Sequence, residues 1–395
     1  MQIPESGPFG ASAAEYVRRR AAALALLAAQ DCDILVAFAP ATIFYLTAYR
    51  VPESERPFAL ILDRDGRTTL FVPLLKAEDA RTAGTDEVVH YAEYPGDTHP
   101  IVLLGRLLGA AGTHILADAP THQNQHGMSC PALADVCPRP VRVARDAVED
   151  LRKVKSAEEI ALIAHAARWA MAAQDSLTLS ARAGCTESAV AGEATGRVVR
   201  ALREAADGRT VTRPLTVSAS FGGQIGPRGT ADHVVEALDP MIGPGDMLIT
   251  RATAMIGGYY ADVERTMVAG AASAAVRDLF ARGLEVQDAA LAMVGPGVAV
   301  AEIEAKVLQL YARLGLTGAW RHHTGHSVGV LTRERPFIDL GDPTVLEPGM
   351  VVTVEPGIYR PGVGGFRHSD CLVVTTTGAD NLTPSPRDLA SLTVG

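Results

Sequence analysis

The chain has 395 residues, of which 48% are hydrophobic and 21% are charged, a composition typical of a soluble globular protein. Two domains are expected at this length, because a single hydrophobic core rarely serves more than about 250–300 residues. The formal net charge of -9 provides no basic surface for a polyanion, which argues against nucleic acid as a partner.

The cysteines and the first residues bear on where the protein works. The five cysteines include no C-x-x-C pair, so neither a disulfide framework nor a zinc site is predicted, and a reducing cytoplasm is favoured. The first ten residues lack a basic segment followed by an apolar run, so no signal peptide is expected. The apolar stretch over 21–30 is too short to cross a membrane. We therefore expect a cytoplasmic protein with no membrane partner.

The first part of the chain alternates helical and extended patterns. Ser12-Ala-Ala-Glu15 is a capping box that opens a helix to about Ala29. The run from Asp33 to Phe38 is typical of a buried strand. The other elements expected here are two strands over 58–62 and 68–72 joined by a turn at 63–66, a helix over 101–111 and a strand over 113–117. Strands alternating with helices predict a smaller α/β domain, to which we assign residues 1–148.

The remainder of the chain, residues 149–395, is predicted to form a larger α+β domain. Its start is the charged segment 149–155, and a second capping box, Ser156-Ala-Glu-Glu159, opens a helix to about Ser180. The later elements expected are helices over 186–206, 274–294 and 301–314, and strand pairs over 247–255 with 259–268 and 351–354 with 370–375. Helices beside antiparallel strands indicate the α+β class.

The hairpin near Gly257 carries acidic residues on one face. Side chains alternate along a strand, so Tyr260, Asp262 and Glu264 share a face. A two-residue turn at Ile256-Gly257 would place Asp262 opposite Arg251. This pattern alone favours a solvated strand face with a cross-strand ion pair over a functional site.

Two further motifs favour a functional site. Thr324-Gly-His-Ser-Val-Gly329 places His326 between small residues that allow a close approach of backbone. Glu355 ends an apolar strand just before a Pro-Gly turn. A carboxylate in that position costs several kcal/mol in desolvation unless it is paired or ligated.

The order of these motifs resembles the creatinase and Xaa-Pro aminopeptidase superfamily. The hairpin reads Y-x-D-x-x-R-T, and it is followed by G-H-S-x-G, by E-P-G-I-Y and by G-G-x-R. The resemblance extends over about 151–383. It implies a pita-bread catalytic domain preceded by a creatinase-like N-terminal domain, and it implies a homodimer.

The resemblance also implies five metal-ligand positions, two of which have changed. In this chain they carry Arg251, Asp262, His326, Glu355 and Ser369. A guanidinium beside the two remaining carboxylates would neutralise them and repel a dication. We therefore expect no metal and no other cofactor.

The metal-free creatinase branch supplies a second set of residues by resemblance. Its active site carries over to His233 as the acid and base, with Tyr260, Glu264 and Glu355 shaping the pocket. Substrate binding is assigned to the residues listed next. They are Arg251, Asp262, His326, Arg333, Arg335 and Arg56, the last from the N-terminal domain of a partner subunit.

The sequence thus predicts a metal-independent hydrolase, or a lyase, that cleaves a C–N bond of a small zwitterionic molecule. Amino-acid-like, guanidino and amidine compounds fit this chemistry. One alternative is an Xaa-Pro metallopeptidase that keeps a single ion through Asp262, His326 and Glu355. The other is a catalytically inactive pita-bread binding module.

Overall fold

The computed structural model describes residues 8–122, 129–206, 215–230 and 239–395. The chain forms two compact units. One is Ser12–Arg152, and the other is Lys153–Gly395 together with the segment that ends at Ala11. The division therefore falls four residues after the expected one at 148/149, and the segment before Ser12 groups with the second unit.

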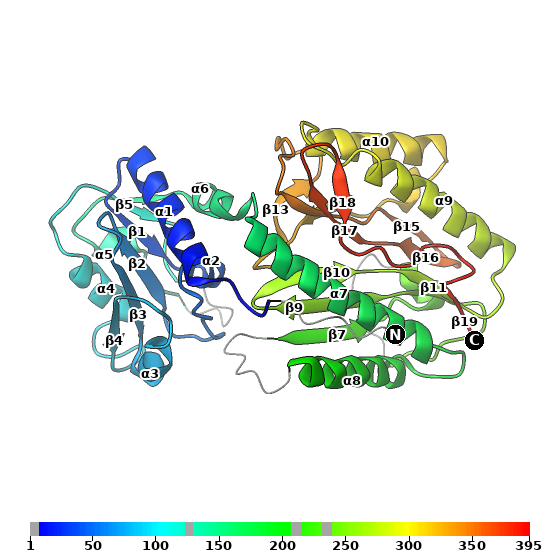
Figure 1. Ribbon diagram of the computed structural model, residues 1–395, viewed down its shortest axis with the longest axis horizontal. Coiled ribbons are helices and arrows are strands. Elements are labelled where there is room, and N and C mark those ends of the chain that lie inside the picture. Colours follow the sequence, from blue (N-terminus) through cyan, green and yellow to red (C-terminus); the bar gives the residue numbers. More distant parts are fainter. Residues whose placement is uncertain (1–7, 123–128, 207–214, 231–238) are drawn as a thin grey trace. The chain divides into compact units, whose positions relative to one another are not determined.

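As far as the structure describes it, the first unit is built on one mixed six-stranded sheet in the order β4-β3-β2-β1-β5-β6 (Figure 1). Its strands are β1 (Ile34–Ala37), β2 (Ala59–Asp63), β3 (Thr68–Pro73), β4 (Glu87–Tyr91), β5 (Ile115–Ala117) and β6 (Val141–Val143). Its helices are α1 (Ala13–Ala29), α2 (Pro40–Thr47), α3 (Ala77–Ala80), α4 (Pro100–Leu108), α5 (Leu133–Val136) and α6 (Arg145–Glu149), with 3-10 turns η1 (Leu74–Lys76) and η2 (Asp150–Arg152).

The helix cap and the hairpin turn that the sequence predicts in this unit are present. Ser12 caps α1, since its hydroxyl accepts from the Glu15 amide (3.2 Å). Strands β2 and β3 form the predicted antiparallel hairpin, with Gly66 in the turn at φ 86°. Parallel pairing of β1 with β5 and of β5 with β6 makes this an α/β unit.

Within its described residues, the second unit contains four sheets and four long helices. Its strands are β7 (Thr216–Ser220), β8 (Met247–Ile249), β9 (Arg251–Ile256), β10 (Tyr259–Val263), β11 (Thr266–Ala269), β12 (Gly325–Ser327), β13 (Glu334–Ile338), β14 (Val351–Val354), β15 (Gly357–Arg360), β16 (Gly364–Arg367), β17 (Asp370–Val374), β18 (Ala379–Asn381) and β19 (Thr393–Val394). Its helices are α7 (Ala157–Ser180), α8 (Glu187–Ala206), α9 (Ala274–Leu291) and α10 (Val300–Arg313), with 3-10 turns η3 (Gly226–Thr230) and η4 (Thr317–Ala319).

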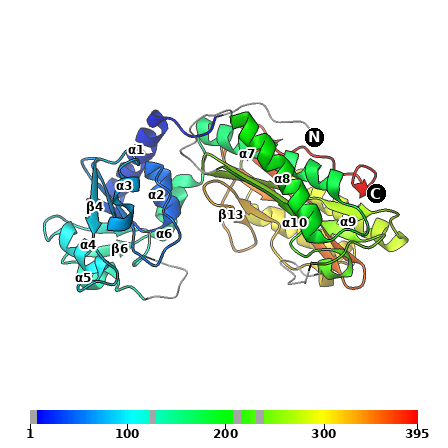
Figure 2. The same cartoon turned by 90° about the horizontal axis from the view of Figure 1, so that it is seen from below.

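In the described residues, the long helices of this unit pack on three of its sheets. Helix α7 lies along β9 and β10 and α8 along β7 (Figure 1; Figure 2). Helices α9 and α10 pack against each other, with α10 on β13 and α9 on β14, β15 and β16. Strand β10 also contacts β17, which joins the two layers at the place where the motifs of the sequence converge. The predicted α+β pita-bread domain, preceded in the chain by a smaller α/β domain, is confirmed.

The register of the β9–β10 hairpin differs from the expected one by two residues. The turn is Gly257-Gly258, with φ values of 58° and 87°, so Ile256 pairs with Tyr259 and Thr253 with Asp262. A tight hairpin turn needs positive φ at both central residues, which two glycines satisfy and Ile256 does not. Asp262 therefore lies opposite Thr253 and not opposite Arg251.

One close contact fixes α9 on strand β16. A Cβ built on Gly283 would lie 2.1 Å from a ring carbon of Phe366, which is fully buried. Gly283→Ala is expected to lower the free energy of unfolding by about 1–3 kcal/mol, because overpacking outweighs the gain in helix propensity. Gly192→Ala in α8 is the matched control. Apart from its chain neighbours and the backbone of its own helix, no described atom lies within 4 Å of its Cβ position, so the free energy of unfolding measured with urea should rise by roughly 0.5–1 kcal/mol. Equal effects at the two positions would show that α9 does not depend on this contact.

Candidate active site

A pocket of about 130 Å³ opens where β9, β10 and β12 meet. It receives side chains of both charges within a small volume. The polar residues that line it are Arg251, Thr253, Tyr260, Asp262, Glu264, His326, Thr332 and Arg333. The alternation along β10 that was read from the sequence thus brings Tyr260, Asp262 and Glu264 to one place.

His326 and Glu355 form a buried pair beside Asp262. His326 Nε2 lies 3.4 Å from Glu355 Oε1, and His326 Nδ1 lies 3.1 Å from the Ser327 carbonyl oxygen. If Nδ1 carries the proton and donates to that carbonyl, Nε2 is the nitrogen that faces the carboxylates. Strand β14 pairs with β17 over Val351–Val354, which sets Glu355 at the end of a fully buried strand.

The three groups shift one another's protonation. Burial and the negative charge of Glu355 raise the pKa of Asp262 to about 7. Burial opposes ionisation of Glu355, but His326 and other cations nearby hold its pKa below the ordinary value. Burial alone would lower the pKa of His326, yet the charges of Glu355 and Asp262 and the hydrogen bonds raise it. One carboxylate is therefore firmly ionised, while the other titrates near neutral pH.

The donors present suit one hard divalent ion. Asp262 Oδ1 is buried and has no hydrogen-bond partner among the described residues. With His326 and Glu355 it offers the two carboxylates and one imidazole that a three-ligand catalytic ion uses. Within the described ranges no three His, Cys, Asp or Glu side chains form a ready-made group for a metal, so these three would have to close around the ion.

A second ion has no such donors. Ser369 is fully buried and its hydroxyl oxygen has no hydrogen-bond partner among the described residues, but it brings no charge. Arg251 brings a positive charge. The residues present therefore fit a single ion and not a pair.

Arg251 does not neutralise Asp262. Its Nε lies 3.9 Å from Glu264 Oε1, and its Nη2 donates to Gln224 Oε1 (3.3 Å). This follows from the hairpin register, since Ala252 pairs with Val263 and the next residues across the ladder are Arg251 and Glu264. The expected pairing of Arg251 with Asp262 is wrong.

Glu264 is held by Arg367, a residue that the sequence reasoning left without a role. Arg367 contacts both carboxylate oxygens, with Nη2 donating to Oε1 (3.0 Å) and Nε to Oε2. Its Nη1 donates to the Tyr359 hydroxyl (2.9 Å) and its Nη2 also to Gln224 Oε1 (3.2 Å). An arginine in the buried strand β16 was the available signal, because a buried cation requires a counter-charge.

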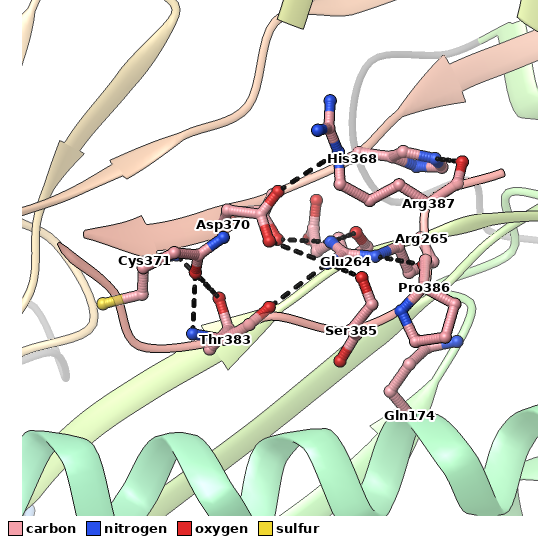
Figure 3. Close-up of polar contacts among 12 residues, drawn as sticks. Gln174, Glu264, Arg265, His368, Asp370, Cys371, Thr383, Ser385, Pro386 and Arg387 are labelled. Carbon is pink, nitrogen blue, oxygen red and sulfur yellow. Dashed lines mark hydrogen bonds and ion pairs between the residues drawn. The ribbon is translucent and has the colours of Figure 1, made fainter. Parts of the chain in front are cut away.

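A second buried network lies behind the pocket and was also missed (Figure 3). The side chains of Arg265 and Asp370 are both fully buried, and Arg265 Nη2 lies 2.7 Å from Asp370 Oδ1. The guanidinium also donates to the Glu264 and Ser369 carbonyl oxygens, each at 2.8 Å. It thereby fixes the end of β10 against the start of β17.

Several predicted residues lie away from the pocket or outside the described part of the chain. His233 falls in 231–238, which the structure does not describe. Arg335 is on β13 and is not among the residues that line the pocket. Arg56 belongs to the first unit, where it pairs with Glu55 (3.1 Å). The roles of these three stay predictions.

The fold and the pocket together define a two-domain hydrolase of the pita-bread class, and comparison with known proteins is consistent with this. Residues 161–376 match the model of metallopeptidase family M24, and residues 19–122 match the creatinase/prolidase N-terminal domain. The chain therefore belongs to metallopeptidase family M24. In the described part of the chain, no helix has both the length and the apolar character needed to span a bilayer.

Named relatives resemble this chain over most of its length. The Xaa-Pro dipeptidase of Pyrococcus furiosus is 29% identical over 330 residues, which are 84% of this chain and 88% of that protein. The probable dipeptidase PepE of Mycobacterium bovis is 29% identical over 95% of this chain and 96% of its own length. The crystal structure of the dipeptidase PepE from Mycobacterium ulcerans is 28% identical, covers 96% of this chain and 98% of its own, and superposes with a TM-score of 0.80.

These relatives correct the functional prediction. A metal-independent, creatinase-type hydrolase or lyase is wrong, because the matching family model is that of a metallopeptidase and the relatives are named dipeptidases. The physical argument for that prediction also fails in the structure. It required Arg251 to occupy Asp262, whereas Arg251 is paired with Glu264 and Asp262 Oδ1 has no hydrogen-bond partner among the described residues.

Proposed function

We propose that this protein is a metallopeptidase that hydrolyses Xaa-Pro dipeptides with a single divalent ion. The observation that carries the proposal is the meeting of Asp262, His326 and Glu355 in one buried place at the pocket. Similarity to an Xaa-Pro dipeptidase over 84% of the chain supports the substrate class.

The three residues named above would hold the ion, which when bound polarises the scissile carbonyl and acidifies water. Asp262, with its pKa near 7, gives up a proton on binding a cation, so affinity for the ion rises with pH. Glu355 is already ionised. Glu355 therefore supplies a permanent negative charge, whereas Asp262 must lose a proton before it binds the ion.

Other residues of the pocket meet the substrate rather than the ion. Tyr260 and Thr253 bring hydroxyl groups to the same cavity, where a hydroxyl can donate to a carbonyl oxygen as negative charge develops on it. The amide of Tyr260 donates to the Gly329 carbonyl (2.8 Å), which ties β10 to the loop after β12. Tyr260 also pairs with Met255 of β9, so its backbone is held on both sides.

The substrate class is tested with purified protein and Mn²⁺ on a panel of dipeptides. Ala-Pro is expected to be cleaved, with Ala-Ala and Pro-Ala slower by at least about tenfold in kcat/KM. Release of free proline, measured by chromatography, is the readout. Cleavage of all three dipeptides at equal rates would contradict the Xaa-Pro specificity. Cleavage of none of them would contradict the peptidase activity.

A further inference from the structure

Arg251 has two carboxylates within reach on the neighbouring strand. Continuing the β9–β10 ladder by one pair places Glu264 directly opposite Arg251, while Asp262 pairs with Thr253. Arg251 and Thr253 lie on the same face of β9, and both line the pocket. Asp262 is therefore the diagonal neighbour of Arg251, at roughly the 7–8 Å that a long side chain can span. The strand register alone does not decide which carboxylate the guanidinium contacts.

Glu264 is a weak partner for Arg251, because Arg367 occupies both of its oxygens. Arg367 Nη2 donates to Oε1 (3.0 Å) and Nε to Oε2, whereas Arg251 Nε stays 3.9 Å from Oε1. Arg251 Nε is buried and makes no hydrogen bond with the described residues, and Asp262 Oδ1 is equally without a partner among them. A buried donor without an acceptor costs free energy, which a pairing of Arg251 with Asp262 would recover.

A buried glutamine opposes that pairing. Arg251 Nη2 donates to Gln224 Oε1 (3.3 Å), and Arg367 Nη2 donates to the same oxygen (3.2 Å). A guanidinium can only donate, so the atom that both arginines contact is the amide oxygen. Gln224 is fully buried. It therefore holds the two cations beside each other through one neutral acceptor.

The loop that carries Gln224 is anchored and lies close to the guanidinium. Both carboxylate oxygens of Glu187, at the start of α8, accept from the Gly223 amide (3.0 Å each). At Gly222, where φ is 57°, an added Cβ would lie 3.3 Å from Arg251 Nε. The Gln224 oxygen is therefore presented to Arg251 from a fixed backbone.

We propose that Gln224 is a positioning residue that keeps the Arg251 guanidinium beside Glu264 and so leaves Asp262 available to the divalent ion. This inference rests on the proposed single-ion site. Without the Gln224 oxygen, Arg251 turns to its diagonal neighbour. That pairing removes a negative charge that the ion needs and places a positive charge beside it. Gln224 does not line the pocket, so it acts through Arg251.

Titration calorimetry with Mn²⁺ on ion-free protein tests the inference. Gln224→Met removes the acceptor at similar side-chain length. It should bind Mn²⁺ at least roughly tenfold more weakly than wild type, because a charge-assisted pair must first be broken. Gln224→Met/Arg251→Met should return to within about threefold of wild type, because the competing cation is gone. Gln224→Glu keeps an acceptor oxygen and should bind Mn²⁺ like wild type. A double variant as weak as Gln224→Met would overturn the proposal.

Gln174→Met is the matched control for the loss of a buried glutamine. Gln174 Oε1 accepts from the hydroxyl of Thr250, the residue before Arg251, and neither Gln174 nor Thr250 lines the pocket. Its Mn²⁺ affinity is expected to equal that of wild type. The same loss of affinity in Gln174→Met and Gln224→Met would mean that altered packing near β9 is the cause, and the positioning role would be rejected.

A crystal structure of ion-free Gln224→Met separates a failure of this inference from a failure of the ion site. The Arg251 guanidinium is expected within about 3 Å of an Asp262 oxygen. That movement, in a protein whose wild type binds no Mn²⁺, would keep the positioning role and reject the single-ion peptidase. One ion in the wild type, with Arg251 unmoved and Mn²⁺ affinity unchanged in the variant, would do the reverse.

Arg251→Met decides the matter if Gln224→Met does not fold. Glu264 keeps Arg367 as its partner in this variant, so no carboxylate is left uncompensated. With no competing cation, Arg251→Met should bind Mn²⁺ at least as tightly as wild type. Weaker binding would show that Arg251 supports the ion and would refute the inference.

Discussion

Replacement of Arg265 by methionine is expected to lower the free energy of unfolding by about 3–5 kcal/mol, the usual effect of breaking a fully buried ion pair. Arg265 and Asp370 have no exposed side-chain surface. Among the described residues, the variant would leave the Asp370 carboxylate with Gln287 Nε2 at 2.8 Å and Arg387 Nε at 3.7 Å. It would also remove the donors to the carbonyl oxygens of Ser385 (3.0 Å) and Pro386 (2.9 Å), which hold the last segment of the chain.

Denaturant unfolding monitored by tryptophan fluorescence measures this effect, and a surface pair provides the control. Arg313→Met breaks an ion pair whose side chains are 63% and 47% exposed, so a loss below about 1 kcal/mol is expected. The double variant Arg265→Met/Asp370→Leu should recover part of the loss, because it removes the uncompensated charge. An Arg265→Met variant as stable as Arg313→Met would show that Asp370 is satisfied by other groups.

This network also supports the pocket. Arg265 accounts for the fixed distance between Glu264 and Ser369, whose backbones exchange two hydrogen bonds at 3.3 and 2.9 Å. Glu264 in turn orients Arg367. A charged pair behind the pocket therefore positions the carboxylate next to Arg251, and stability and site geometry depend on the same residues.

Local signals in the sequence were sufficient for the fold. The capping box at Ser156 and Glu159 is present with both reciprocal hydrogen bonds, and α7 ends at Ser180 as expected. Strands β14 and β17 pair as the apolar runs indicated. These features depend on residues close in sequence, where propensity and capping act directly.

The site was harder to predict because it depends on register and on distant contacts. The turn was predicted at Ile256-Gly257 but lies at Gly257-Gly258. The predicted strand pairing was therefore shifted by two residues, and Arg251 was assigned the wrong partner. The pairing of Glu264 with Arg367 joins residues that are 103 positions apart, and no local pattern reports it. The sequence resembles two branches of one superfamily, the metallopeptidases and the metal-free creatinases. The resemblance alone did not decide between them, because the decision depended on which carboxylate Arg251 contacts.

Removal of the divalent ion is expected to abolish dipeptide hydrolysis, with a loss of kcat/KM of roughly a thousandfold or more, since several kcal/mol of transition-state stabilisation would be lost. Protein treated with chelator and reloaded with Mn²⁺ should recover activity when about one ion per chain is bound, because Asp262, His326 and Glu355 are the donors that the described part of the site offers to a cation. Elemental analysis of the reloaded protein gives this stoichiometry independently of turnover.

His326→Ala tests the same site through the protein. It removes the only nitrogen donor of the set and the positive partner of Glu355, so Mn²⁺ affinity should fall by roughly 100-fold or more and activity should fall with it. His90→Ala, at an exposed position of β4 in the other unit, should change neither. Full Mn²⁺ binding by His326→Ala would place the ion elsewhere, and two ions per wild-type chain would mean that Arg251 leaves room for a second one. If the wild-type chain binds one ion and His326→Ala does not bind it, the protein works as a single-ion peptidase although two of its ligand positions are replaced.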